Sequence, residues 1–415
     1  YCKHRCRFQP SRVGLGDFFM IKLIVHRGGH EIGGSAVELR SPRGRILLDL
    51  GAPLDYDVRA TSDMDGLRRG GVLPKISGLF MDDTPSFDAI LLSHAHLDHS
   101  GLLTYAHPDI PLVLSGGSKA LMELGMRFLK QPIVANKQVI FEMDRTFSIA
   151  DMQITPYLMD HSAFDAAAFE ILADGRRIVY TGDFRNHGRK GTCFERFLER
   201  VAPSPDILLC EGTTLGRGDD PAQTETELEQ EIAECLKRTN GIALFQCASQ
   251  NIDRLVTFCR AAQRAGRIMV IDRYTAATLA ELRKLGNKLP TAGRHPNLSI
   301  RRPEDVQKTL MLVRPSMLAE LRKDDTIQNG VFFYSLWNGY RSQPGQVELE
   351  EFLSERDFEL VEAHTSGHAD SEALRRLLSK LNPKQIIPIH TLAPERFTAF
   401  SDRVRVVRDG EIVEC

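Results

Sequence analysis

The sequence lacks a paired cysteine motif, a long apolar run and an excess of either charge. Its eight cysteines are scattered over 415 residues without a CxxC pair, which argues against a secreted disulfide framework and indicates a reducing, cytoplasmic compartment. No run approaches the ~18 uninterrupted apolar residues of a membrane span, so we expect no membrane partner. Lys and Arg total 53 against 55 Asp and Glu, so the net charge of −2 gives no indication of nucleic-acid binding.

Internal repeats and low-complexity tracts are also missing, which argues against a solenoid or a fibrous chain. The composition is 42% hydrophobic and 26% charged, as in ordinary globular proteins. The length predicts two or three domains. Residues 1–19 lack the apolar run of a secretory signal, and we expect them to be a flexible leader.

The pattern of strands and helices changes near residue 212. Before it, short apolar β-type runs dominate, including two runs at 166–172 and 176–181 that flank Asp174-Gly175, a strong hairpin signal. After it, expected helices at 224–238, 251–264 and 275–286 alternate with strands at 242–246 and 268–271. Such alternation predicts a parallel sheet covered by helices. Closing elements follow: a strand at 358–362, a helix at 370–381, and strands at 385–389 and 404–407.

Positive charge gathers in the second of these regions. Residues 251–323 contain fifteen Lys or Arg and six Asp or Glu, on a chain that is otherwise acidic. A local excess of this kind favours a polyanionic ligand, although arginines that merely solvate helix faces remain the alternative.

One short motif carries the strongest chemical signal. An apolar strand at 87–92 is followed by Ser93-His94-Ala95-His96-Leu97-Asp98-His99, which is HxHxDH. Alternate residues of extended backbone share a face, so His94 and His96 can bind one ion. If a helix starts next, Asp98 and His99 are redirected to a neighbouring point. The motif therefore predicts ligands for two metal ions.

Further candidate ligands stand where other apolar strands end. His161 follows 152–159, Asp183 follows 176–181, and His390 follows 385–389. Imidazole and carboxylate ligands suit zinc, with manganese as the alternative, and the lack of thiolate favours a catalytic site. Asp49, at the end of the run 45–50, is expected to anchor a histidine ligand through its second nitrogen.

Together these motifs resemble the metallo-β-lactamase superfamily. Glu211 in EGT, His368 in SGH and His390 in IPIH resemble the ordered motifs of its β-CASP nucleases, and the C-terminal motifs are especially similar to the ribonuclease J family. The resemblance implies an α/β fold: an αββα sandwich with an inserted parallel α/β domain of β-CASP type. The expected parts are the leader at 1–19, the sandwich at 20–211 and 358–415, and the insert at 212–357.

The resemblance also implies a division of roles. His94, His96 and His161 would hold one zinc ion, Asp98, His99 and His390 a second, and Asp183 would bridge the two. Asp98, Glu211 and His368 would be the catalytic residues, the last two by orienting the scissile phosphate or protonating the departing oxygen.

A phosphate seat is expected between the strand at 358–362 and the helix at 370–381. Exposed N–H groups and the helix dipole favour an anion there, and the residues concerned are His364, Ser366, Gly367 and His368. A second strand-to-helix junction at Ser249 offers another nucleotide contact, with a plain helix cap as an equal alternative. Tyr334 and Trp337 are candidates for base stacking, although core aromatics are as common.

The function that we expect is hydrolysis of single-stranded RNA, either internally or from a 5′ end, by a two-metal phosphodiesterase. A DNA nuclease of the β-CASP type is the first alternative, and a lactonase- or thioesterase-like hydrolase is the second. A catalytically silent RNA-binding subunit is a third, but no ligand of the motif is missing. Because the ribonuclease J family carries a further C-terminal domain used in assembly, we expect a monomer or dimer.

Overall fold

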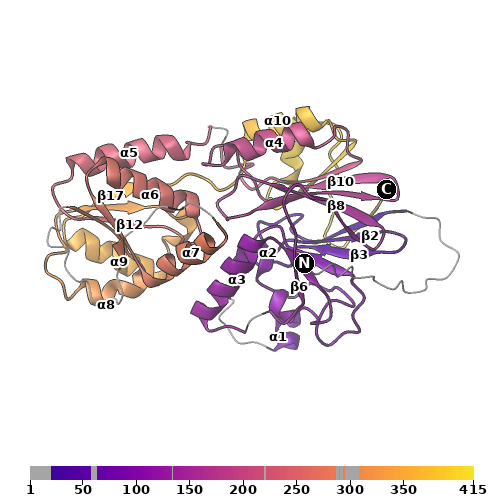
Figure 1. The fold of residues 1–415 in the computed structure, drawn as a ribbon, viewed down its shortest axis with the longest axis horizontal. Helices are drawn as coiled ribbons and strands as arrows, with labels where there is room; N and C mark the ends of the chain where they lie inside the picture. The colour runs from indigo at the N-terminus through magenta and orange to yellow at the C-terminus, as the bar shows by residue number, and fades with distance from the viewer. Residues whose placement is uncertain are drawn as a thin grey trace.

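The computed structural model describes residues 20–57, 63–132, 134–218, 221–286, 289, 293–294 and 308–415, so the expected leader lies outside the described residues. The first of its three sheets has the order β19-β1-β2-β3-β4-β5-β6 (Figure 1). Its strands are β1 Lys22–Arg27, β2 Ala36–Arg40, β3 Arg45–Leu48, β4 Ala89–Leu91, β5 Leu112–Leu114, β6 Gln138–Ile140 and β19 Ile412–Glu414. The last strand of the chain therefore pairs with the first, in antiparallel register.

The second sheet has the order β18-β11-β10-β9-β8-β7. Its strands are β7 Phe147–Ile149, β8 Met152–Leu158, β9 Ala167–Ala173, β10 Arg176–Tyr180, β11 Ile207–Glu211 and β18 Gln385–Ile389. Asp174 and Gly175 join β9 to β10 with φ angles of 47° and 72°. Both lie in the left-handed region that a two-residue turn requires, so the predicted hairpin is present.

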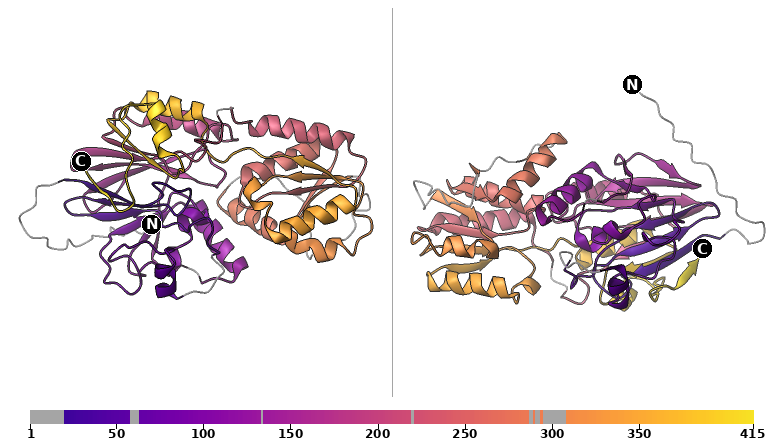
Figure 2. Two further views of the ribbon diagram at one scale, coloured as in Figure 1. Left: turned by 180° about the vertical axis from the view of Figure 1, so that it is seen from behind. Right: turned by 90° about the horizontal axis from the view of Figure 1, so that it is seen from below.

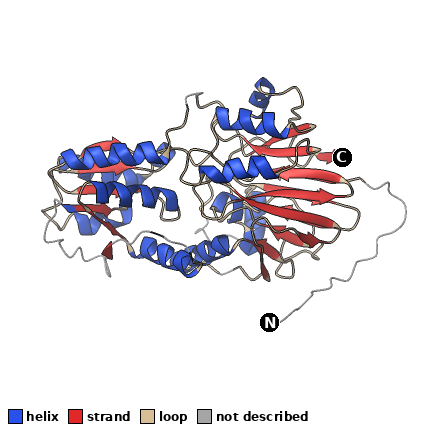
Figure 3. Cartoon of the chain, turned by 45° about the horizontal axis from the view of Figure 1, so that its top comes forward, coloured by secondary structure: helices blue, strands red, loops and turns tan. Residues whose placement is uncertain are grey.

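These two sheets form the inner layers of a four-layer sandwich. Apolar side chains of the first sheet, such as Val37 and Leu48, share one core with Ile154 and Ile178 of the second. The outer layers are helical, with α4 Gly191–Arg200 and α10 Ser371–Leu381 over the second sheet and α3 Gly116–Leu129 against the first (Figure 3). Shorter helices on the side of the first sheet are α1 Met64–Arg69 and α2 Leu97–Ser100.

The third sheet belongs to a separate lobe, rose to orange in Figure 1, which we call the insert lobe. Its order is β14-β13-β15-β12-β16-β17, and every pair in it is parallel. The strands are β12 Ala243–Gln246, β13 Ile268–Ile271, β14 Gly293–Arg294, β15 Thr309–Leu312, β16 Val331–Tyr334 and β17 Glu359–Glu362. Its helices are α5 Glu225–Arg238, α6 Ile252–Arg264, α7 Arg273–Lys284, α8 Leu318–Leu321 and α9 Pro344–Glu355. The predicted alternation of strand and helix is confirmed.

The two lobes lie side by side in all three views of the ribbon (Figure 2). Helix α3 of the sandwich contacts α7 of the insert lobe, where the rings of Phe128 and Tyr274 lie 4.8 Å apart. One apolar core, which includes Leu112, Leu121 and Phe245, continues from the outer face of the first sheet into the insert lobe. No helix among the described residues is long and apolar enough to cross a membrane.

Two details differ from the expectation. Strand β17 falls in the part assigned to the closing sandwich, yet it pairs with β16, so the third sheet extends beyond residue 357. The predicted strand at 404–407 is also wrong, because that segment makes one isolated bridge, between Ile386 and Val404, and the final strand is β19. In both cases the local pattern indicates extended backbone, but only the partner strand decides the sheet.

Candidate metal centre

The predicted ligands meet where strands of the two inner sheets end. Strands β10, β11 and β18 are parallel neighbours, and β8 runs the same way because both it and β10 are antiparallel to β9. Their carboxyl ends therefore lie at one edge of the second sheet and release His161, Asp183 and His390. From the first sheet, β4 ends just before His94 and His96.

The side chains form three groups, and within each group the candidate ligand atoms lie within 4.8 Å of one another; the second and third groups share Asp183 and His390. The groups are His94, His96 and His161; Asp98, His99, Asp183 and His390; and Asp183, Glu211, His368 and His390. Asp183 Oδ2 lies 3.2 Å from His99 Nε2 and 3.8 Å from His94 Nε2. This carboxylate therefore stands between the first two groups, in position to serve both.

Three of the histidines are oriented by a polar contact of their Nδ1 atom. His161 Nδ1 donates to the carbonyl of Gly367 at 2.6 Å, and His99 Nδ1 donates to Asp49 Oδ2 at 2.8 Å. His390 Nδ1 lies 2.8 Å from the hydroxyl of Thr213. Since a carbonyl oxygen only accepts hydrogen bonds, the Nε2 atom of His161 keeps a lone pair toward the cluster.

Asp49 is the anchor beneath the HxHxDH loop. Besides His99, it accepts hydrogen bonds from the backbone N–H and the hydroxyl of Ser93, both at 2.7 Å, and from the hydroxyl of Tyr180 at 2.6 Å. Asp49 has a φ of 61° and His390 a φ of 51°, a left-handed conformation that costs a residue other than glycine about 1 kcal/mol or more. Such strain persists where surrounding contacts hold the backbone, as they do here.

Two buried atoms of the cluster are suited to a cation. The hydroxyl of Ser93 donates to Asp49, so it accepts from His94 Nδ1 at 3.1 Å and leaves His94 Nε2 as an acceptor. Within the described part of the chain, His94 Nε2 and Asp183 Oδ1 have no hydrogen-bond partner. Buried polar atoms are rarely left unpaired, so this donor set fits metal ions.

The protonation states of His94 and Asp183 also suit cation binding. Burial, reinforced by the neighbouring histidines, lowers the pKa of His94 well below its usual value and keeps the ring neutral. Burial alone would raise the pKa of Asp183, but His390 and His99 outweigh it and hold that pKa well below its usual range. The centre therefore combines a neutral imidazole with an ionised carboxylate, which are the forms that bind cations.

Glu211 and His368 form a pair at the edge of the centre. Glu211 is buried, and its carboxylate accepts from the N–H groups of Phe184 at 3.0 Å and Thr213 at 3.1 Å. His368 Nδ1 lies 3.3 Å from Glu211 Oε1 and 3.6 Å from Asp183 Oδ2. Burial would lower the pKa of His368, but Glu211 and Asp183 raise it to about 9. Because both oxygens of Glu211 are engaged with backbone, this residue fixes His368 in place.

The expected phosphate seat is less open than the sequence indicated. The carboxylate of Asp370 caps α10 by accepting from Ala373 N at 2.8 Å, so an acidic side chain already occupies the helix N-terminus. The hydroxyl of Ser366 accepts from His368 N at 3.0 Å. His364 is exposed. The carboxylate of Asp370 therefore competes with a phosphate for the N-terminus of this helix.

Ser249 lies at the carboxyl end of β12, away from that segment in sequence. Its buried hydroxyl lies 2.6 Å from the hydroxyl of Thr275 and accepts from Arg314, which also binds Asp272. The contacts that the structure shows for Ser249 are thus with the insert lobe itself.

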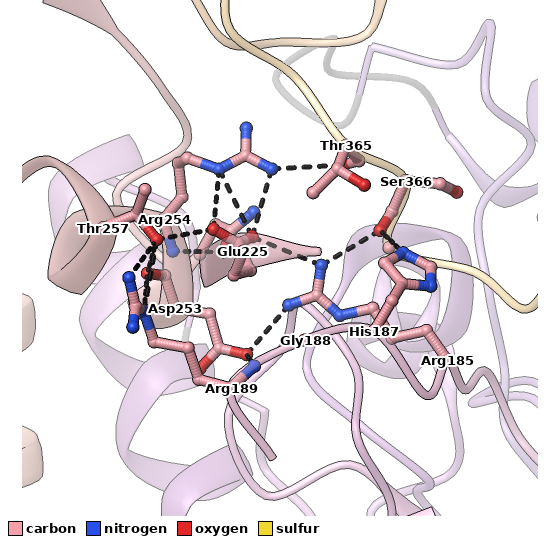
Figure 4. A network of polar contacts seen from close by, with 12 residues as sticks. Arg185, His187, Gly188, Arg189, Glu225, Asp253, Arg254, Thr257, Thr365 and Ser366 are labelled. Atoms are coloured by element: carbon pink, nitrogen blue, oxygen red, sulfur yellow. Dashed lines mark hydrogen bonds and ion pairs between the residues drawn. The ribbon is translucent and has the colours of Figure 1, made fainter. Parts of the chain in front are cut away.

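Behind the metal centre, charged side chains join the two lobes (Figure 4). We call Arg185, Arg189, Glu225, Asp253 and Arg254 the interlobe ion network. Arg185 follows β10, two residues after Asp183, and donates to Asp253 Oδ2 at 2.8 Å. Arg254 Nη2 donates to Glu225 Oε1 at 3.1 Å, and neither guanidinium group is exposed to solvent. The network thus ties the loop of a metal ligand to helices α5 and α6.

The interlobe ion network also holds residues 365–366, where the chain passes from the insert lobe back to the sandwich. Arg254 donates to the carbonyl of Thr365 at 3.1 Å, and Arg185 donates to that of Ser366 at 2.9 Å. His187 Nε2 also donates to Ser366, at 2.9 Å (Figure 4). The segment before His368 is therefore positioned by its carbonyl groups.

Sequence reasoning missed this network. We would place His187 on the surface by its polar surroundings in sequence, yet it is only 6% exposed. Neither its neighbours nor those of Arg185 show a local pattern of burial. The one available signal is that Arg185 follows Asp183 so closely that it must approach the centre.

Part of the positive charge of the basic segment at 251–323 is engaged in contacts within the protein. Arg254 binds Glu225, and Arg264 binds Glu229 at 2.8 Å, so two of its charges are paired with acids just outside the counted range. Arg267 is buried and donates to backbone carbonyls, such as that of Gly241 at 3.0 Å. Arg254 and Arg267 therefore stabilise the packing of the protein and are not free to bind a polyanion.

Comparison with known proteins agrees with this architecture. The profile of the beta-lactamase superfamily domain matches residues 69–241, and that of the Zn-dependent metallo-hydrolase RNA specificity domain matches residues 359–413. A crystal structure of a protein of unknown function from Enterococcus faecalis superposes with a TM-score of 0.78 at 22% identity. It covers 95% of this chain and 100% of its own, and it supports the fold alone.

Among characterised proteins, ribonuclease J of Helicobacter pylori is 22% identical over 97% of this chain. The chain spans 62% of that relative's length. Ribonuclease J of Pyrococcus abyssi is 23% identical over 95% of this chain and 97% of its own. Residues 69–241 are therefore part of a beta-lactamase superfamily domain and residues 359–413 are an RNA specificity domain of Zn-dependent metallo-hydrolases, in a fold that agrees with a metallo-β-lactamase sandwich bearing a β-CASP-type insert.

Proposed function

We propose that this protein is a two-metal phosphodiesterase that hydrolyses single-stranded RNA, internally or from a 5′ end. The observation that carries the proposal is the pair of candidate ligand groups around Asp183. They lie at the edge of the sandwich to which the RNA specificity domain contributes His368 and His390. The names of the ribonuclease J relatives support RNA as the substrate.

In this proposal His94, His96 and His161 would hold one ion and Asp98, His99 and His390 the other, and Asp183, which lies between the two groups, would serve both. Zinc suits this set of imidazole and carboxylate groups, with manganese as the alternative. When bound, such a pair of ions supplies a nucleophile from water near neutral pH and stabilises the attacking and leaving oxygens of an in-line displacement.

The protein's own groups then position the substrate. His368 stands beside Asp183 and Glu211, where it can donate a hydrogen bond to the scissile phosphate or a proton to the departing oxygen. Glu211 is a positioning residue, because its oxygens hold His368 and the backbone on either side of the centre. Asp98 Oδ2 lies 3.2 Å from His390 Nε2, close enough for both atoms to serve one ion.

The test is a comparison of substrates. Labelled single-stranded RNA and DNA of one sequence, with 5′-hydroxyl, monophosphate or triphosphate ends, are incubated with the zinc- or manganese-loaded protein. We expect RNA to be cut, and the product lengths distinguish internal cleavage from trimming. Preferential cleavage of DNA would replace the proposal with the DNA nuclease, and cleavage of neither, with turnover of a lactone or thioester, would overturn it.

A further inference from the structure

Two exposed aromatic rings lie on the loop that follows β16 in the insert lobe. Trp337 is 46% exposed and Tyr340 is 41% exposed, and their ring centroids are 5.4 Å apart with planes at 88°. Tyr334, the other candidate for stacking, is fully buried at the end of β16. Large aromatic side chains that stay exposed as a pair commonly mark a binding surface.

The loop is held rigidly although its rings are exposed. The hydroxyl of Tyr334 donates to the carbonyl of Trp337 at 3.0 Å. Arg341 donates to Glu350 at 2.6 Å and to Glu362 at 3.1 Å, which fastens the loop to α9 and β17. A side chain at Gly339 would meet the Trp337 ring at 2.3 Å, so that ring lies directly on the backbone of Gly339. The aromatic pair is therefore pre-organised, which reduces the entropy lost when a ligand binds.

The loop that carries the pair starts beside the segment that leads to the metal centre. Ser335, two residues before Trp337, donates to the carbonyl of Ala363, and Arg254, which is hydrogen-bonded to Ser335, donates to the carbonyl of Thr365 at 3.1 Å. His368 follows Thr365 by three residues. On the sandwich side, Leu97 precedes Asp98 and is 48% exposed, and Leu392 follows His390 by two residues and is 67% exposed. Exposed apolar side chains therefore also adjoin residues that would hold the ions.

We propose that Trp337 and Tyr340 form a stacking platform for the bases of a single-stranded nucleic acid whose phosphodiester is cut at the metal centre. The inference rests on the proposed function and adds to it the part of the substrate that the insert lobe contacts. Every base has an apolar face, so such a platform binds strands with little sequence preference. Recognition by stacking also agrees with an insert lobe in which Arg254 and Arg264 are paired with the lobe's own acids.

Fluorescence tests the contact directly, because Trp337 is the single tryptophan of the chain. The full-length, zinc-loaded protein is mixed rapidly with a single-stranded RNA oligomer, and Trp337 emission is recorded before products accumulate. We expect quenching by the oligomer and none by an abasic oligomer of equal length and charge. Equal emission with and without the base-bearing oligomer, at concentrations where it is bound by filter retention, would overturn the platform.

Kinetics provide the second readout. Trp337→Ala should raise the KM for the base-bearing oligomer about tenfold relative to the abasic one, and Trp337→Phe, which keeps a ring, should restore most of the difference. Phe128→Ala is the matched control, since Phe128 is 42% exposed but packs on Tyr274 at the contact between α3 and α7. An unchanged KM ratio in Trp337→Ala would contradict the proposal.

The two hypotheses fail in different ways. If no oligomer is cleaved by the wild-type protein, the proposed phosphodiesterase fails, and the fluorescence titration alone then decides for or against the platform. If RNA is cleaved but Trp337 emission does not respond and the KM ratio stays unchanged, the platform fails while the metal centre retains its proposed role.

Discussion

The metal centre and the interlobe ion network are both buried clusters of charged side chains, but they are completed differently. In the network, Arg185 and Arg254 face Asp253 and Glu225 directly, so each charge has its counter-charge within the protein. In the metal centre, His94 Nε2 and Asp183 Oδ1 are buried without a partner in the described residues. A network in which every charge is paired fixes the positions of its side chains. A buried cluster whose nitrogen and oxygen atoms lack hydrogen-bond partners is suited to bind a ligand such as a cation.

The largest effect is expected from removing a ligand of the metal centre. Asp98→Ala should reduce RNA hydrolysis to background while the far-UV circular dichroism spectrum and the urea midpoint of the metal-free protein stay near those of the metal-free wild type. Asp109→Ala, at an aspartate whose side chain is 80% exposed, should retain full activity. Full activity in Asp98→Ala would refute the assignment of the centre.

The network should show the opposite pattern, with stability affected more than chemistry. Glu225→Gln leaves Arg254 and Arg185 without their shared carboxylate, and removing one partner of a buried ion pair typically costs about 3–5 kcal/mol. Urea unfolding of the metal-loaded protein measures the loss. Glu234→Gln on the same helix, where the side chain is 67% exposed, should leave the free energy of unfolding nearly unchanged. Equal stability of the two variants would show that the network is dispensable.

The contribution of Glu225 should also depend on pH in a defined direction. Burial alone would raise the pKa of Glu225, but Arg254 and Arg185 lower it from 4.5 to about 2. A carboxyl whose pKa is lower in the folded state stabilises the fold above its unfolded pKa and loses this effect as pH falls toward the folded value. The difference in stability between wild type and Glu225→Gln should be constant from pH 6 to pH 8 and should shrink below about pH 4.5. A difference that grew on acidification would contradict this account.

Metal binding should stabilise the protein only through the unpaired cluster. At a free zinc concentration a hundred times the dissociation constant, ligand binding to the folded state adds about 2.7 kcal/mol. Thermal unfolding with and without zinc should show this gain in the wild type and in Glu225→Gln. Asp183→Ala should lose most of it. An equal gain in Asp183→Ala would place the ions elsewhere.

A smaller effect is expected at the segment that the network holds. Ser366 is positioned through its carbonyl by Arg185 and His187, so Ser366→Ala should keep the backbone in place and remove only one hydroxyl. We expect the preference for a 5′-monophosphate over a 5′-hydroxyl RNA to fall about two- to tenfold, as for the loss of one hydrogen bond. His364→Ala should act similarly. No change in either variant would mean that this segment serves only to position His368.

The metal centre was far more predictable than the network. HxHxDH after an apolar strand, and single His or Asp residues after three others, pointed to the seven side chains of the first two groups that the structure brings together. The network has no such signal, because Arg185, Glu225 and Arg254 come from distant segments with ordinary surroundings. The same limit explains β17, an edge strand whose local pattern indicates extended backbone but not which sheet it joins.

By itself the sequence determined the strand-rich sandwich, the alternating insert and the chemistry of the ligands, because local periodicity and side-chain type are properties of neighbouring residues. Only the tertiary structure decided which charges are paired. It buried Arg254 against Glu225, closed the N-terminus of α10 with Asp370, and left Trp337 and Tyr340 exposed while Tyr334 went into the core. These outcomes depend on contacts between segments far apart in the chain, and such contacts are fixed only when the lobes pack together.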